Sequence, residues 1–192
     1  MSRMEFGIVY RPKSGRSVSG DAYLIKEEEE ATLICLVDGL GSGEGAAEAA
    51  QAAIGCVEVN GTLSLSDIMA KCHQALKGTR GAVIALTRIS FAESTVTFVG
   101  VGNIGIHVRS TAPIKPISKN GIVGYRLPRL KEFAYPYTPG DIFVLHTDGI
   151  SNRFTLDNAM WMQEAQDVQT LADEIAQNFG KENDDLTVII AR

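Results

Sequence analysis

The chain has 192 residues, of which 45% are apolar and 21% charged, and its 18 Lys and Arg against 23 Asp and Glu give a formal net charge of −5. These fractions exclude a disordered chain and suit one domain, residues 1–192, with a core of its own. The acidic balance disfavours nucleic-acid binding by phosphate neutralisation, and no apolar run reaches the length of a membrane span.

The cysteines and the N-terminal residues bear on the compartment. Cys35, Cys56 and Cys72 are an odd number without CxxC spacing. Residues 1–16 lack the apolar segment of a secretory signal. We therefore expect a cytoplasmic protein whose thiols are reduced and lie in its core.

Short apolar runs rich in β-branched residues and bounded by turn residues predict strands. They cover 5–10, 22–25, 32–37, 82–89, 95–101, 104–108, 142–147 and 186–191. The glutamates at 27–30 fall between two of these runs and predict a solvated hairpin turn. In 104–108 apolar and other residues alternate, which predicts one buried face.

Three segments have helical periodicity instead. Residues 44–58 carry one narrow polar stripe on an Ala-rich surface, which is typical of a helix largely buried against a sheet, and Ser42 is its predicted N-cap. Residues 65–77 follow a capping-box spacing that starts at Ser64. Residues 168–179 place their apolar side chains on one face.

The order of these elements indicates the fold class. Strands are followed by two helices, further strands, and then one helix and one strand. This order does not give the repeating βαβ units of a Rossmann-like sheet. We therefore predict an α+β fold of mostly antiparallel sheet with segregated helices.

Four aspartates lie at the ends of predicted strands. Asp38 and Asp148 follow strands, whereas Asp21 and Asp184 precede them. Because the end of one antiparallel strand lies beside the start of its neighbour, all four can meet at one edge. Gathered carboxylates repel one another unless cations neutralise them, and a site with few His and no thiol pair favours Mg²⁺ or Mn²⁺ over zinc. One Asp-Gly after a strand is more often a simple turn, so the inference depends on the four together.

Glycines surround Asp38 and continue to Gly45, just before the Ala-rich helix. The loop could cradle a phosphate at the helix N-terminus, or it could be only a turn. It lacks the Gly-Lys-Ser/Thr ending of a P-loop and does not match GxGxxG within a βαβ unit. We favour a third interpretation, in which Gly39 offers its backbone carbonyl to a metal ion because no side chain obstructs it.

Five motifs occur in a characteristic order along the chain. They are Ser19-Gly20-Asp21, Val37-Asp38-Gly39-Leu40-Gly41-Ser42-Gly43, Gly100-Val101-Gly102-Asn103, Pro139-Gly140-Asp141 with Thr147-Asp148-Gly149, and Asp184-Asp185-Leu186-Thr187. In combination they resemble the signature blocks of the PPM/PP2C-type metal-dependent serine/threonine phosphatases, most of all the compact SpoIIE/RsbX-like bacterial branch. The resemblance covers nearly the whole chain. It implies a four-layer α-β-β-α sandwich of mostly antiparallel sheets with two Mn²⁺ or Mg²⁺ ions at one end.

The resemblance also implies roles for individual residues. Asp38 would bridge both metals, and Gly39 would bind one of them through its carbonyl. Asp148 and Asp184 would complete one metal site, and Asp21 would hold the other ion. Two such metals could deliver a bridging hydroxide in line to phosphorus, with no protein nucleophile.

The chain departs from the family pattern at one position, and the roles of some other residues stay open. Leu40 stands where larger relatives carry a His proposed as the general acid, so no acid is assigned. Arg16 lies five residues before Asp21, where relatives place a phosphate-binding Arg, although a solvated loop charge is the alternative. Asp185 is expected to support the site or a turn. All three histidines are expected to be structural or surface groups: His73, His107 and His146.

The segment 109–131 holds six Lys and Arg and no Asp or Glu, and it is rich in Gly and Pro. It predicts a long loop beside the metal edge that recruits an acidic phosphoprotein by charge, with a solvated loop face as the alternative. The resemblance implies STAS-domain stressosome proteins as substrates, and we expect the protein to be a monomer. Two other classes stay open: an inactive phosphatase-like binding module, and a nucleotide-binding switch that uses the glycine loop.

Overall fold

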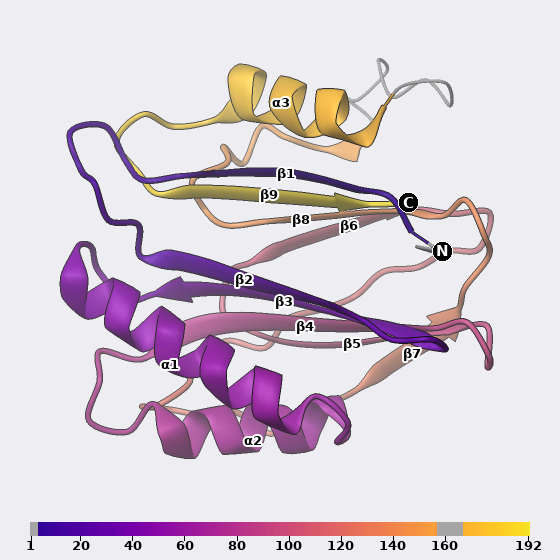
Figure 1. The fold of residues 1–192 in the computed structure, drawn as a ribbon, viewed down its shortest axis with the longest axis horizontal. Coiled ribbons are helices and arrows are strands. Elements are labelled where there is room, and N and C mark those ends of the chain that lie inside the picture. Colours follow the sequence, from indigo (N-terminus) through magenta and orange to yellow (C-terminus); the bar gives the residue numbers. More distant parts are fainter. Residues whose placement is uncertain (1–3, 157–166) are drawn as a thin grey trace.

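The computed structural model describes residues 4–156 and 167–192. Two antiparallel sheets lie face to face, with helices on both outer sides, so the chain forms four layers (Figure 1). This arrangement confirms the predicted α+β fold with an α-β-β-α order of layers.

The sheets divide the strands in a way that mixes distant parts of the chain. The four-stranded sheet has the order β1 (Phe6–Arg11), β9 (Leu186–Ala191), β8 (Ile142–His146) and β6 (Gly105–Arg109). The five-stranded sheet has the order β2 (Asp21–Glu27), β3 (Ala31–Gly39), β4 (Ala82–Ser90), β5 (Thr95–Val101) and β7 (Phe133–Pro136). Every strand pair is antiparallel, so strand ends and starts alternate along each edge.

All the predicted strands are present, with two differences. The edge strand β7 was not predicted, because it has only four residues, ends in Pro136 and follows a Gly/Pro-rich segment. Asp21 and Asp38 lie inside β2 and β3 rather than beyond them. The two aspartates are paired in the register of β2 and β3, so the hydrogen-bonded pairing of these strands extends as far as Asp21 and Asp38.

Helices α1 (Glu44–Asn60) and α2 (Leu65–Ala75) cover the five-stranded sheet, and α3 (Val168–Phe179) covers the four-stranded sheet (Figure 1). The predicted cap of α2 is confirmed, since the Ser64 side chain accepts a hydrogen bond from the Asp67 N–H. Among the described residues, no helix is long and apolar enough to cross a membrane.

The prediction that Ser42 caps α1 is wrong. The N-cap residue is Gly43, at φ +75°, a backbone conformation that glycine adopts without steric cost. The Ser42 carbonyl instead accepts a hydrogen bond from the Arg80 guanidinium at 3.2 Å. The glycine therefore decides where this helix begins.

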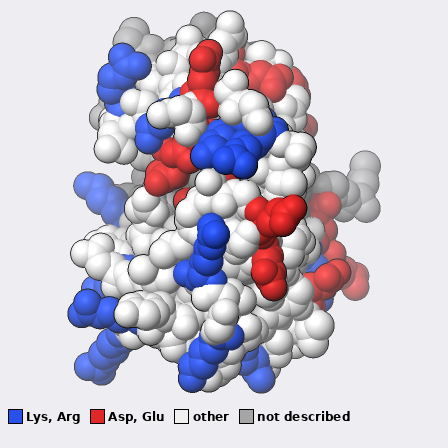
Figure 2. All heavy atoms as spheres, turned by 90° about the vertical axis from the view of Figure 1, so that its left-hand side faces the viewer, with Lys and Arg blue, Asp and Glu red and all other residues white. Residues whose placement is uncertain are grey.

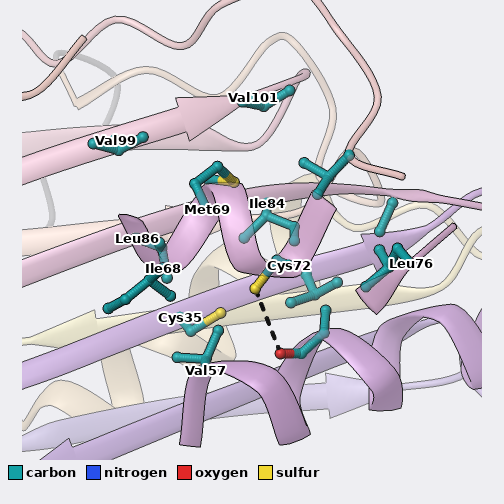
Figure 3. Packing of buried hydrophobic residues seen from close by; sticks show 14 of the residues in the cluster. Cys35, Val57, Ile68, Met69, Cys72, Leu76, Ile84, Leu86, Val99 and Val101 are labelled. Atoms are coloured by element: carbon teal, nitrogen blue, oxygen red, sulfur yellow. Dashed lines mark hydrogen bonds between the residues drawn. The ribbon is translucent and has the colours of Figure 1, made fainter. Parts of the chain in front are cut away.

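The core between α1, α2 and the five-stranded sheet contains Cys35 and Cys72 (Figure 3), and the partly buried Cys56 packs against it. Cys35 and Cys72 are fully buried, and all three thiols are free. Burial raises the pKa of both buried thiols well above the ordinary value. Their role is packing, as the sequence predicts.

The segment 109–131 is more ordered than a free loop. Val123 pairs with Ala82 through two backbone hydrogen bonds of 2.8 and 3.0 Å. The Gly124 N–H donates to Nδ1 of His73 at 3.0 Å. The loop is therefore fixed to α2 and to the start of β4, and His73 has the structural role that the sequence predicts.

Candidate metal centre

The side chains of Asp21 and Asp38 point into the space between the two sheets. Successive side chains alternate between the faces of a strand, and Asp38 shares its face with Ile34 and Leu36, which pack in the inter-sheet core. Asp21 lies directly opposite Asp38 on β2, so it shares that face. Asp21 is 2% exposed. The five-stranded sheet thus supplies two neighbouring acids at one end of the sandwich.

The four-stranded sheet supplies the other two acids. Asp148 follows the end of β8 by two residues, and Asp184 precedes the start of β9 by two. These strands are antiparallel neighbours, so the two loops lie side by side, at the left-hand end of Figure 1. Asp38, Asp148 and Asp184 line one cleft of about 420 Å³. The structure therefore brings the four predicted aspartates to one edge.

The electrostatics of this edge favour a bound cation. Burial, followed by the negative charges of its acidic neighbours, raises the pKa of Asp38 to about 8. Burial also raises the pKa of Asp21 to about 7, although hydrogen bonds from Thr187 and Thr147 oppose the shift. The pKa of Asp184 is raised by burial first and then by Asp148. Divalent cations would favour the ionised form of every one of these carboxyl groups.

Asp148 is held by two partners that the sequence did not single out. The Asn103 side-chain amide donates to its Oδ2 at 3.1 Å. The Lys181 ammonium donates to its backbone carbonyl at 2.6 Å. Asn103 belongs to a motif that we noted, but only the fold shows that it reaches across to the loop after β8.

Asp185 supports a turn, as expected from the sequence. Its carboxylate accepts hydrogen bonds from the N–H groups of Lys13 at 2.9 Å and Gly20 at 2.7 Å. These bonds fix the loop between β1 and β2. Arg16 in this loop does not line the acidic cleft, but an adjoining polar hollow of about 460 Å³ that it shares with Arg80 and the start of α1.

Gly39 has a reason to be glycine besides an open carbonyl. A Cβ at this position would lie 2.0 Å from the Ala46 carbonyl oxygen, so α1 could not approach β3 so closely. The Gly39 N–H donates to the Gly20 carbonyl at 2.9 Å. The lack of a side chain at Gly39 therefore lets α1 pack directly against the end of β3.

Leu40 lines the cleft, so an apolar side chain stands beside the acids. His107 and His146 do not line it; their Nε2 atoms lie 3.1 Å apart and their rings contact Phe154. Burial lowers the pKa of both imidazoles, that of His146 to about 4. These two histidines are neutral packing groups near neutral pH.

The described side chains include no group of three or more His, Cys, Asp or Glu that could hold a metal ion as they stand. The donor set nevertheless fits hard divalent cations, because it consists of carboxylate oxygens gathered at one edge, where burial and the negative charges of its neighbours raise the pKa of Asp38. The residues that would hold the ions are Asp21, Asp38, Asp148, Asp184 and the carbonyl of Gly39.

Comparison with known proteins agrees with this arrangement. A chain from a solved structure described as "The bacterial stressosome: a modular system that has been adapted to control secondary messenger signaling" is 35% identical, with a TM-score of 0.93 over 100% of both chains. A crystal structure of RsbX in complex with magnesium is 26% identical, with a TM-score of 0.88, and the match covers 98% of this chain and 94% of that one. The fold is thus that of the PP2C phosphatase domains, which include the one of SpoIIE from Bacillus subtilis.

The sequence comparisons define the family. The phosphoserine phosphatase RsbX of Bacillus subtilis (strain 168) is 28% identical over 182 residues, which are 94% of this chain and 90% of that protein. The family model described as Stage II sporulation protein E (SpoIIE) matches residues 28–192. The chain belongs to this SpoIIE family of PP2C-type protein phosphatases.

Proposed function

We propose that this protein is a metal-dependent phosphatase that hydrolyses phosphoserine and phosphothreonine on cytoplasmic regulatory proteins, with STAS-domain stressosome proteins as its substrates. The observation that carries the proposal is the edge at which four aspartates from two sheets meet beside one cleft. Support for the substrate comes from the similarity to RsbX, a phosphoserine phosphatase, and to a chain from stressosome work.

In this proposal the protein supplies position and charge rather than a nucleophile. When bound, two divalent cations would lower the pKa of a water molecule and offset the charge of the phosphoryl oxygens. Asp38, Asp148 and Asp184 would hold these ions together with Asp21. Asn103 and Lys181 keep the loop that carries Asp148 in place. The fully buried thiols Cys35 and Cys72 are not available for attack.

Residues on one wall of the cleft suggest how a protein substrate is recognised. Asn120, Gly121 and Ile122 line the cleft together with the acids. The same segment continues to Arg126 and Arg129, whose side chains are exposed. On the end of the molecule shown in Figure 2, Lys and Arg side chains lie along the lower rim, and both basic and acidic side chains lie above them. We propose that the segment 109–131 attracts the phosphoprotein by charge.

The experiment that tests the function uses purified protein freed of metal by a chelator. Phosphorylated STAS-domain proteins are incubated with it, with and without Mn²⁺, and dephosphorylation is read by intact mass. We expect a loss of one phosphate mass only when Mn²⁺ is added. A chain that binds the phosphoproteins without removing phosphate would instead be a binding module. A thermal shift with nucleotide but not with Mn²⁺ would indicate the nucleotide switch.

Recruitment by charge has its own test. Arg126→Glu with Arg129→Glu should lower kcat/KM for the phosphoprotein about tenfold at low salt and leave hydrolysis of a small aryl phosphate unchanged. Lys71→Glu, at an exposed lysine of α2 outside the segment, is the matched control. Equal losses on both substrates would assign the arginines to catalysis or folding.

A further inference from the structure

Two buried threonines meet Asp21 at the acidic edge. Thr147 follows the end of β8, and Thr187 is the second residue of β9. Both are completely buried. Thr187 shares its strand face with Ile189, and Thr147 continues the face of Leu145, so both point into the inter-sheet space from the four-stranded sheet.

The two hydroxyls converge on a single oxygen. Thr147 Oγ1 and Thr187 Oγ1 each donate to Oδ2 of Asp21 at 2.8 Å. The N–H of Thr187 donates to Thr147 Oγ1 at 3.0 Å, so the one hydroxyl hydrogen of Thr147 is free to point at the carboxylate. With Oδ2 occupied by two donors, Oδ1 is the oxygen of Asp21 left for another ligand.

The contact joins the two halves of the acidic edge. Asp21 lies opposite Asp38 on the five-stranded sheet, whereas the threonines belong to the other sheet. Thr147 immediately precedes Asp148, and Thr187 follows Asp184 by three residues. Each threonine is therefore in the same short chain segment as one acid of the four-stranded sheet, whereas Asp21 belongs to the five-stranded sheet. A shift between the sheets at this end would break the two hydrogen bonds that the threonines donate to Asp21.

We propose that Thr147 and Thr187 are positioning residues that fix the two sheets relative to each other at the metal centre and aim Oδ1 of Asp21 at an ion. This inference rests on the proposed two-metal function. Neither hydroxyl touches substrate in this role. The threonines act through Asp21, and their loss weakens metal binding before it affects the chemical step.

The test compares isosteric and conservative variants. Thr147→Val and Thr187→Val remove a hydroxyl and keep the shape, whereas Thr147→Ser and Thr187→Ser keep the hydroxyl. Metal-free protein is titrated with Mn²⁺ in a calorimeter. We expect the wild type to bind two ions and each valine variant to bind one of them about 10–100-fold more weakly. The serine variants should stay close to the wild type. The Mn²⁺ concentration for half-maximal activity should rise in the valine variants while kcat at saturating Mn²⁺ changes little.

Thr87→Val is the matched control. Thr87 is completely buried and faces the same inter-sheet core from β4, and its hydroxyl makes no hydrogen bond to any described residue. It should bind both ions as the wild type does. Thermal unfolding in chelator checks that every variant folds, and alanine variants replace any valine variant that does not.

The results separate this inference from the function on which it rests. Unchanged affinities in folded valine variants, beside a wild type that binds two ions, would overturn the positioning role alone. Serine variants as weak as the valine ones would also overturn it, because the methyl group rather than the hydroxyl would then matter. A wild type that binds fewer than two Mn²⁺ would overturn the two-metal proposal and the positioning role together.

Discussion

Strand β8 has an aspartate near each end, and the two have very different surroundings. Asp141, just before the strand, is buried and accepts a hydrogen bond from the Thr138 N–H at 2.9 Å, and its own N–H donates to the Thr138 carbonyl at 3.0 Å. The cavity beside it, about 470 Å³, is lined by Arg109 and Arg192. Asp148, just after the strand, lines a cleft of about 420 Å³ with two further aspartates.

The difference shows what makes an aspartate a candidate ligand. Both residues adjoin a glycine in a turn, so their local sequences are similar. Asp141 closes its turn and needs no further partner, whereas Asp148 meets carboxylates brought by strands that are distant in sequence. The two ends of β8 therefore differ in whether other carboxylates lie beside the aspartate, and not in the glycine next to it.

The largest expected effect comes from removing an acid of the candidate metal centre. Asp148→Ala should lower Mn²⁺-dependent hydrolysis at least about 10²–10³-fold, because the site loses stabilisation of the reacting charge. Asp38→Ala should do the same and leave the fold intact. Asp141→Asn, at the other end of β8, should keep its Mn²⁺ response. Initial rates on an aryl phosphate check this, and a comparable loss in Asp141→Asn would mean that the two ends do not differ as proposed.

A second prediction concerns Leu40 in the acidic cleft. General-acid help is typically worth ~10²–10⁴-fold, and no described histidine lines the cleft to supply it. The rate should therefore depend steeply on the pKa of the leaving group when chemistry limits turnover. A series of aryl and alkyl phosphates at saturating Mn²⁺ measures the slope. A flat series would show that another residue protonates the leaving oxygen.

The third prediction is the pH dependence of stability without metal. A carboxyl group with a raised pKa binds its proton more tightly in the folded protein, so stability falls as the pH rises from the unfolded value near 4 through the folded value. For Asp21 and Asp38 this loss extends to about pH 7 and 8. His146, whose pKa falls to about 4, acts in the opposite direction, but only below its ordinary pKa near 6.5.

Between pH 6.5 and 8, the change in stability therefore reflects the two aspartates without the opposing contribution of His146. Across this window the metal-free protein should lose about 1–2 kcal/mol of stability, or a few degrees in Tm. Thermal unfolding in chelator measures the change, and Asp38→Asn should flatten it. A Tm that rises with pH across this window would contradict the electrostatic account of the acidic end.

Much of this comparison could be predicted from the sequence, because it depends on local patterns. β-Branched runs and helical stripes located nearly all the elements, and acids beside strand ends predicted their meeting. The contacts of Asn103 and Lys181 with Asp148 depend on which strands become neighbours, which no local pattern encodes. The two threonines were visible in the motifs, but their role needed the face on which each side chain lies.

The smallest expected effect lies between the two ends, at Thr87 in the middle of β4. Its buried hydroxyl has no hydrogen-bond partner among the described residues, whereas Thr147 and Thr187 use theirs on Asp21. Burying an unpaired hydroxyl costs about 1–3 kcal/mol, so Thr87→Val should raise the free energy of unfolding by roughly 1 kcal/mol. Denaturant unfolding in chelator measures it, with Thr32→Val, at a buried threonine of β3, for comparison. A loss of stability in Thr87→Val would show that this hydroxyl is paired in solution, for example by a bound water. The interior of the sandwich around Thr87 would then be less apolar than the surrounding side chains indicate.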